Sequence, residues 1–165
     1  MVLQDTVLLV DDDNSFLNVF SRILRKQHFY VVTASTAMAA LEHLKVHSVD
    51  AAILDISLPD RDGTELLVDL LKIYPDLPVI MLTGHSSAQN AIRSLNNGAF
   101  AYLEKPVDPE QLISVMKRGI EKYRLVVENR TLMKELQKRH RETKILLSLS
   151  QKIAHSLDLN NIINS

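Results

Sequence analysis

Strand-like and helix-like segments alternate regularly between Thr6 and Pro109, and this alternation restricts the possible folds more than any other feature of the sequence. The first segment, Thr6–Val10, is apolar throughout and stops at three aspartates, which is typical of a strand buried on both faces. In the following segment, about Asn14–Gln27, apolar residues recur at helical spacing. Because neighbouring parallel strands need a helical return, the alternation predicts an α/β fold whose parallel sheet is covered by helices on both faces.

The same pattern repeats along the chain and predicts five strands and five helices. Turn residues agree with it, since Pro59 and Gly63 lie in one connection and Asn97-Gly98 closes the fourth helix. The predicted strands are Thr6–Val10, Tyr30–Ala34, Ala51–Ile56, Val79–Thr83 and Ala101–Glu104, and the predicted helices are Asn14–Gln27, Thr36–His47, Thr64–Ile73, Ser86–Asn96 and one that begins at Pro109.

Length and composition set limits on the kind of protein. The 165 residues suffice for one domain of roughly 100–150 residues with an appendage. The formal net charge of −1 gives no global attraction to nucleic acid or to an anionic membrane, so we expect neither partner. There is no cysteine, which excludes disulfides and thiolate chemistry, and no apolar run is long enough for a membrane span or follows a basic start as in a signal peptide. We therefore expect a cytoplasmic protein.

The helical pattern that begins at Pro109 continues almost to the end of the chain. Gly119 is the single interruption before Asp158, and one glycine costs a helix only about 1 kcal/mol. We expect residues 124–165 to form a coiled-coil extension that pairs with a second copy, and a helix folded back on its own domain is the alternative. The two heptad positions are occupied by Leu125, Leu132, Arg139, Leu146 and Ile153, and by Asn129, Leu136, Thr143 and Ser150.

Chemically useful side chains follow four of the predicted strands. Asp11 and Asp12 follow the first strand, Asp55 lies at the end of the third, Thr83 ends the fourth, and Lys105 follows the fifth. Parallel strands present their carboxyl ends at one edge of the sheet, where ligands of such folds bind. Clustered carboxylates repel each other unless a cation neutralises them, so the set favours a hard divalent ion such as Mg²⁺ or Mn²⁺. The cluster suits phosphoryl transfer, with Asp55 as nucleophile and Lys105 and Thr83 on the phosphoryl oxygens.

Four motifs make residues 7–123 resemble the receiver domain of a two-component response regulator. They are LLVDDD at 8–13, LDISLPDRDG at 54–63, VIMLTGH at 79–85 and GAFAYLEKP at 98–106. The resemblance implies a flavodoxin-like, doubly wound (βα)5 domain over residues 1–123 with strand order 2-1-3-4-5. It also implies a phosphoacceptor that takes its phosphoryl group from a sensor histidine kinase, a phosphotransfer protein or a small phosphodonor, rather than a free-standing enzyme.

The resemblance further assigns roles to single residues. Asp12, Asp55 and the backbone carbonyl of Ser57 would hold Mg²⁺ directly, Asp11 would hold it mainly through bound water, and Asp55 would be the phosphoacceptor. Lys105, Thr83 and Asp55 would carry the transfer, Thr83 and Tyr102 would switch conformation, and a cis peptide would join Lys105 to Pro106. Dimerisation would involve the terminal helix, the face of the fourth and fifth helices, or both. Residues 146–165 resemble the first helix of a GAF sensory domain, so we expect the natural protein to continue into an output domain.

Two other functions remain open at this stage. Asp11 and Asp13 form an Asp-x-Asp pair after a first strand, which is similar to a haloacid-dehalogenase-like phosphohydrolase, although the further metal-binding acids and the cap domain of that family are not evident. A dimeric adaptor that works without phosphorylation is the second alternative, and the complete acidic set argues against it.

Overall fold

The computed structural model describes residues 4–84 and 88–163, and it divides into two compact units between Arg124 and Leu125. The first unit contains all strands and the first four helices, together with the start of the fifth helix. The second unit is helical throughout its described residues. Within the described ranges, no helix combines the length and the apolar character that a membrane crossing requires.

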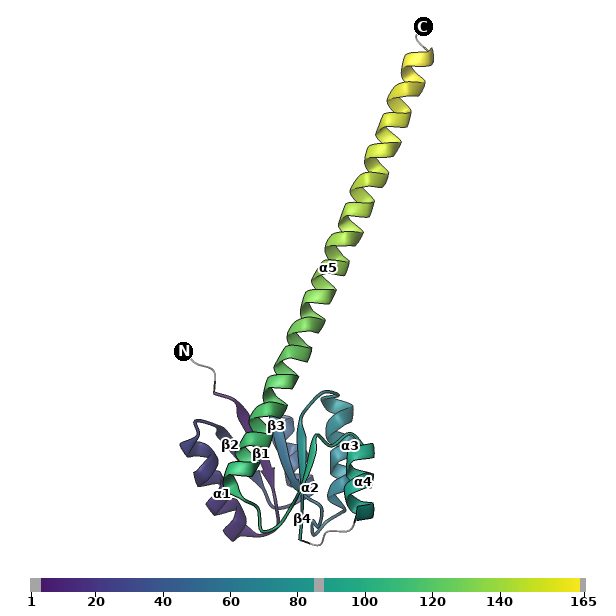
Figure 1. Cartoon of the computed structure of the whole chain (residues 1–165). Helices are drawn as coiled ribbons and strands as arrows, with labels where there is room; N and C mark the ends of the chain where they lie inside the picture. Colours follow the sequence, from purple (N-terminus) through teal and green to yellow (C-terminus); the bar gives the residue numbers. More distant parts are fainter. Residues whose placement is uncertain (1–3, 85–87, 164–165) are drawn as a thin grey trace. The chain divides into compact units, whose positions relative to one another are not determined.

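A five-stranded parallel sheet forms the centre of the first unit, with helices on both faces (Figure 1). The strand order is β2-β1-β3-β4-β5. Strand β2 is added on one side of β1, and β3 to β5 are added on the other side. This confirms the predicted doubly wound fold and strand order, and it places the switch point beside the first and third strands. The strands are β1 (Thr6–Val10), β2 (Tyr30–Ala34), β3 (Ala51–Asp55), β4 (Val79–Thr83) and β5 (Ala101–Glu104).

The sheet separates two hydrophobic clusters, because successive side chains of a strand point to opposite faces. Leu8 and Val10 of β1 pack with helices α2 and α3, whereas Val7 and Leu9 pack with α1 and the start of α5. All four side chains are fully buried, which explains why this strand is apolar throughout. The helices are α1 (Asn14–Lys26), α2 (Ala37–Leu44), α3 (Gly63–Ile73), α4 (Ala88–Asn96) and α5 (Pro109–Ile163).

The helix ends differ slightly from the sequence prediction, and the hydrogen bonds explain why. Helix α2 was predicted to reach His47 but ends at Leu44, where the amides of Lys45 and Val46 bond three residues back in a tighter turn. Strand β3 ends at Asp55 rather than at Ile56, because Ile56 already belongs to a loop that is closed by its carbonyl and the amide of Gly63, 2.7 Å apart. The predicted start of the fourth helix at Ser86 and the motif residue His85 lie outside the described residues.

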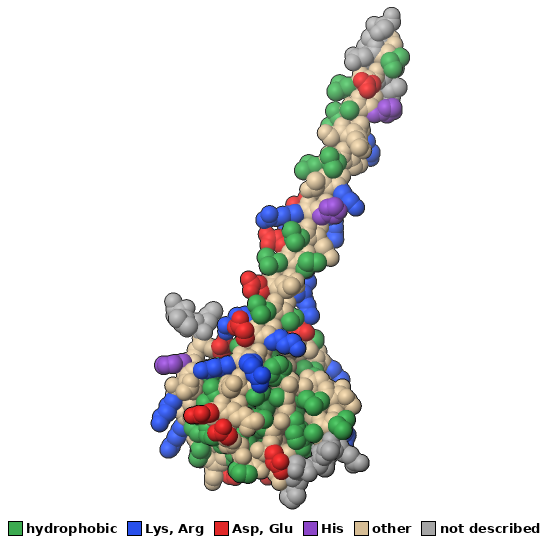
Figure 2. Space-filling view, viewed as in Figure 1, with side chains coloured by type: hydrophobic (Ala, Val, Ile, Leu, Met, Phe, Trp, Pro, Cys, Tyr) green, Lys and Arg blue, Asp and Glu red, His purple; other side chains and the backbone are tan. Residues whose placement is uncertain are grey.

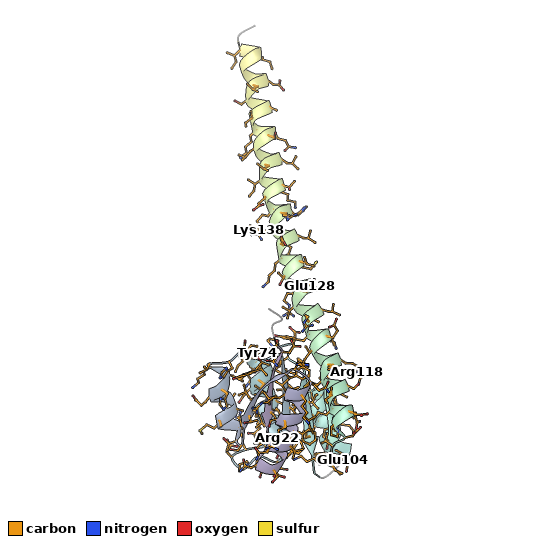
Figure 3. The ribbon with its side chains drawn as sticks, turned by 90° about the vertical axis from the view of Figure 1, so that its left-hand side faces the viewer. Arg22, Tyr74, Glu104, Arg118, Glu128 and Lys138 are labelled. Atoms are coloured by element: carbon orange, nitrogen blue, oxygen red, sulfur yellow. The ribbon has the colours of Figure 1, made fainter. Side chains whose placement is uncertain are left out.

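The second unit exposes apolar and charged side chains together. Leu132, Leu146 and Ile153, which share one heptad position, are 53%, 67% and 61% exposed. Figure 2 shows hydrophobic and charged side chains along this helical segment, and Figure 3 shows Glu128 and Lys138 projecting from it. Exposed leucine and isoleucine at regular heptad spacing are typical of a helix that packs against a partner helix.

Candidate functional site

The predicted site residues lie at the carboxyl edge of the sheet. Asp11 follows β1, Asp55 ends β3, Thr83 ends β4, and Lys105 follows β5. Figure 3 marks this edge with Glu104, the last residue of β5, whereas Tyr74, the residue that follows α3, lies toward the opposite edge. The parallel register is continuous from β2 to β5, so the strands bring segments almost 100 residues apart to one place.

Lys105 is the cation of the site. Its Nζ donates to Oδ2 of Asp11 at 2.6 Å and to Oδ2 of Asp55 at 3.0 Å. The same Nζ lies 4.7 Å from the centroid of the Phe16 ring, which in turn stacks on Phe20 at 4.2 Å. Burial opposes the charged ammonium, but the hydrogen bonds to the two carboxylates outweigh it, and the pKa of Lys105 lies above its usual value. The ammonium therefore stays charged at neutral pH and partly balances the acids.

Asp11 is the most buried acid of the site, with no exposed surface. Its Oδ1 accepts the backbone N–H of Asp13 at 2.9 Å, and its own N–H donates to the carbonyl of Ala34 at 3.1 Å, which joins the ends of β1 and β2. Burial raises the pKa of the Asp11 carboxyl, although Lys105 and the Asp13 amide act in the opposite direction. Keeping the Asp11 carboxylate ionised inside the protein therefore costs free energy, and a bound cation would reduce this cost.

Three acids of this edge are close enough to share one ion. Carboxylate oxygens of Asp11, Asp12 and Asp55 lie within 4.8 Å of one another. Asp11 and Asp55 are buried, whereas Asp12 is exposed to solvent. Lys105 supplies one positive charge against three negative ones. Hard oxygen donors with one side open to water suit Mg²⁺, which prefers carboxylates and retained waters. The donor set therefore fits a divalent metal ion.

The loop after Asp55 is folded tightly back onto the acid. The Ser57 N–H donates to Oδ1 of Asp55 at 3.1 Å, and Ser57 forms an isolated antiparallel bridge with Asp62. Gly63 closes the loop so tightly that a Cβ atom there would lie 2.0 Å from the Asp55 carbonyl oxygen. The loop thereby holds the backbone of Ser57, the predicted source of a carbonyl ligand, beside Asp55.

The two predicted switch residues lie on the neighbouring strands β4 and β5. Thr83 is buried at the end of β4, where its carbonyl accepts the Lys105 N–H at 2.8 Å. Tyr102 is half-buried and packs against the cluster that contains α2 and α3. Its hydroxyl oxygen is buried without a hydrogen-bond partner among the described residues. The Lys105–Pro106 peptide is cis, as the resemblance implied.

Sequence reasoning missed two contacts near the site. Phe16 is one of the apolar residues of the first predicted helix, yet its ring also borders the Lys105 ammonium. Asp60 was not singled out, yet its carboxylate accepts backbone N–H groups from the start of α2, more than 20 residues earlier. Neither contact follows from periodicity, because each joins elements that are distant in sequence. Asp13 caps α1 by accepting the amides of Ser15 and Phe16, a use of the aspartate run that capping preferences do predict.

Comparisons with known proteins agree with this geometry. The family model of the response regulator receiver domain matches residues 7–117. The C4-dicarboxylate transport transcriptional regulatory protein DctD of Rhizobium meliloti is 35% identical over 127 residues, which covers 77% of this chain and 28% of DctD. The chain thus spans less than a third of the length of the curated relatives that it matches.

Solved structures give the same result. A CheY-like receiver domain protein from Methanospirillum hungatei is 37% identical with a TM-score of 0.70, and the match covers 73% of this chain and 97% of the other. The beryllofluoride-activated NtrC4 receiver domain dimer is 33% identical with a TM-score of 0.69, covering 72% and 98%. These matches do not favour the two alternative functions, a phosphohydrolase and an adaptor that works without phosphorylation. From its fold, its acidic site and these matches, the chain belongs to the response regulator receiver domain family of two-component signalling.

Proposed function

We propose that Asp55 is the phosphoacceptor and that Asp11, Asp12, Asp55 and the Ser57 carbonyl hold Mg²⁺, for which Mn²⁺ can substitute. The observation that carries this proposal is the convergence of three carboxylates and one ammonium at the switch point of the sheet. When bound, the metal ion would neutralise charge on the phosphoryl group and on the acids.

The transfer is a substitution at phosphorus. An Asp55 carboxylate oxygen forms the new P–O bond while the bond between phosphorus and the donor breaks, which is a P–N bond in a phosphohistidine. The donor keeps the electron pair of the broken bond. Lys105, whose Nζ lies 3.0 Å from Asp55 Oδ2, would bind a phosphoryl oxygen, and the Thr83 hydroxyl would bind another.

Phosphorylation can be measured directly as a change in intact mass. The wild-type chain and Asp55→Asn would be incubated with acetyl phosphate, with Mg²⁺ or with chelator. One added phosphoryl group that needs Mg²⁺ and is lost in Asp55→Asn would support the proposal. A label that survives in Asp55→Asn but not in Asp11→Asn, with turnover, would favour phosphohydrolase chemistry instead.

We further propose that the phosphodonor is a histidine kinase or a phosphotransfer protein. We place this transfer in the cytoplasm, where the ATP that phosphorylates such kinases is available. Receiver domains are regulatory partners of these kinases, so we expect no separate catalytic activity beyond self-catalysed transfer and autodephosphorylation. The cheapest check is transfer from a purified phosphorylated kinase in the presence of Mg²⁺, with Asp55→Asn as the control.

We also propose that two copies pair through residues 124–165, with or without the face of α4, β5 and α5. The exposed heptad residues Leu132, Leu146 and Ile153 support a coiled coil, and the related NtrC4 receiver was solved as an activated dimer. Phosphorylation would rearrange Thr83 and Tyr102 and bias the pairing of the helices. Sedimentation with and without beryllium fluoride tests this, and an oligomeric state that Leu132→Lys leaves unchanged would contradict the coiled coil.

A further inference from the structure

One exposed carboxylate in the loop after the acceptor bridges two distant segments of the chain. Asp60 Oδ1 accepts the N–H of Ala37 at 2.9 Å, and its Oδ2 accepts the N–H of Met38, also at 2.9 Å. The donors are the first two residues of α2. Both oxygens of a side chain in the β3–α3 loop are thus engaged by a helix that precedes β3.

The start of α2 explains why an acid is used there. The first N–H groups of a helix have no partner inside it, and their dipoles favour negative charge. Thr36 caps α2 by accepting the Ala39 N–H at 3.1 Å, and Asp60 accepts the two preceding amides. These two backbone hydrogen bonds hold the pKa of the Asp60 carboxyl below its usual value, so it is ionised at neutral pH.

The same bridge connects the two halves of the acidic site. On one side, Ala34 at the end of β2 accepts the N–H of Asp11, and α2 begins three residues later. On the other side, the loop that carries Asp60 also carries Ser57, whose N–H bonds to the carboxylate of Asp55. A continuous series of contacts therefore runs from Asp11 through the start of α2 to Asp60 and back to the acceptor.

Two other contacts fasten this loop, but they lead to a different element. Asp62 caps α3 by accepting the N–H of Thr64 at 2.7 Å, and Arg61 pairs with Asp69 of α3 at 2.9 Å. Both contacts hold the loop against the helix that follows it. Asp60 instead joins the loop to the side of the sheet from which Asp11 and Asp12 extend.

We propose that Asp60 is a positioning residue of the metal centre: its carboxylate sets the spacing between the Ser57 backbone carbonyl and the carboxylates of Asp11 and Asp12. The inference rests on the proposed metal-assisted phosphoacceptor function. Asp60 contacts no metal ligand through its own side chain, so its effect should appear in metal affinity. Removal of groups that orient ligands typically weakens metal binding about 10–100-fold. Because Asp60 acts through the loop backbone, we expect about threefold weaker binding in Asp60→Asn and about tenfold in Asp60→Ala.

The experiment titrates the full chain with Mn²⁺ and follows free Mn²⁺ by electron paramagnetic resonance. Asp50→Asn is the matched control, because Asp50 Oδ2 likewise accepts a backbone N–H, that of Thr6 at 2.7 Å, at the opposite edge of the sheet. Thermal melts of all variants in chelator measure the purely structural cost of each change. A helix cap without a positioning role would lower the melting temperature and leave the Mn²⁺ affinity unchanged.

Each outcome decides the inference. Weaker Mn²⁺ binding in both Asp60 variants, with wild-type affinity in Asp50→Asn, supports it. Wild-type affinity in the Asp60 variants overturns it and leaves the proposed metal site standing. If the wild-type chain itself does not bind Mn²⁺, both the inference and the proposed function fail. Should Asp60→Ala be unfolded in chelator, Asp60→Asn, which keeps one acceptor oxygen, decides alone.

Discussion

Replacing Lys105 by methionine tests how the acidic edge is balanced before any metal binds. The Lys105 ammonium lies 2.6 Å from Asp11 and 3.0 Å from Asp55, whose side chains are 0% and 7% exposed. Removing one partner of a buried ion pair costs about 3–5 kcal/mol. The lysine side chain is 23% exposed, so water screens part of the interaction, and we expect a loss of about 2–3 kcal/mol in chelator.

Urea unfolding with chelator and with Mg²⁺ measures this effect. A divalent ion replaces the lost charge, so Mg²⁺ should restore more stability to Lys105→Met than it adds to the wild type. At 100 times the Kd, the gain from binding is about 2.7 kcal/mol. The matched control is Lys72→Met, because Lys72 pairs with Asp69 at 3.1 Å on the surface, where such pairs contribute at most about 1 kcal/mol. Equal stability of the two variants in chelator would refute the reasoning.

Three further predictions concern single buried positions. Burial raises the pKa of Asp11 above 3.8, so its ionisation lowers the stability of the fold as the pH rises from 3.8 through that raised pKa. Asp11→Asn should therefore be about 1 kcal/mol more stable than the wild type in chelator at pH 7, and urea titrations should show this gain shrinking toward pH 4. Gly63→Ala should cost about 3 kcal/mol or more in urea unfolding because its Cβ would lie 2.0 Å from a backbone oxygen, whereas Gly84→Ala, with nothing within 4 Å among the described residues, should be nearly neutral. Ser94→Ala should leave the melting temperature unchanged or raise it, since the buried Ser94 hydroxyl has no hydrogen-bond partner in the described part of the chain. Ser21→Ala should cost about 1 kcal/mol because the Ser21 hydroxyl donates to the Asn18 carbonyl at 3.2 Å. A larger loss of stability in Ser94→Ala than in Ser21→Ala would contradict this reasoning.

The sheet could be predicted from the sequence because most side chains of its strands are buried and apolar, and the exposed strand residues are confined to Tyr30 at the start of β2 and Glu104 at the end of β5. Strands β1, β2, β4 and β5 have the predicted bounds. Helix ends were less predictable, since they depend on local hydrogen bonds: α1 begins where Asp13 caps it, but α2 ends at Leu44, where the amides of Lys45 and Val46 bond three residues back. The residues of the site were predicted for a similar reason, because parallel strands bring their carboxyl ends to one edge whatever lies between them.

What sequence reasoning could not supply is geometry between elements. The contact of Lys105 with the Phe16 ring and the bridge from Asp60 to α2 both depend on how helices pack beside the sheet. The metal ligands, the phosphoacceptor and the pairing of the C-terminal helices stay predictions. The resemblance of residues 146–165 to a GAF domain also stays a prediction, because these residues lie beyond the region that the family model matches.

The position of Phe16 gives the site a built-in magnetic probe. A proton near the face of an aromatic ring experiences the ring-current field, and the Lys105 ammonium lies 4.7 Å from the Phe16 centroid. The ε-methylene protons of Lys105 should therefore resonate upfield of those of an exposed lysine such as Lys72. Any event that draws the ammonium away from the ring would return the resonance toward its ordinary frequency. Selective labelling of lysine would then let NMR follow the state of the acidic edge in solution without an added dye or a tryptophan, a residue that this sequence lacks.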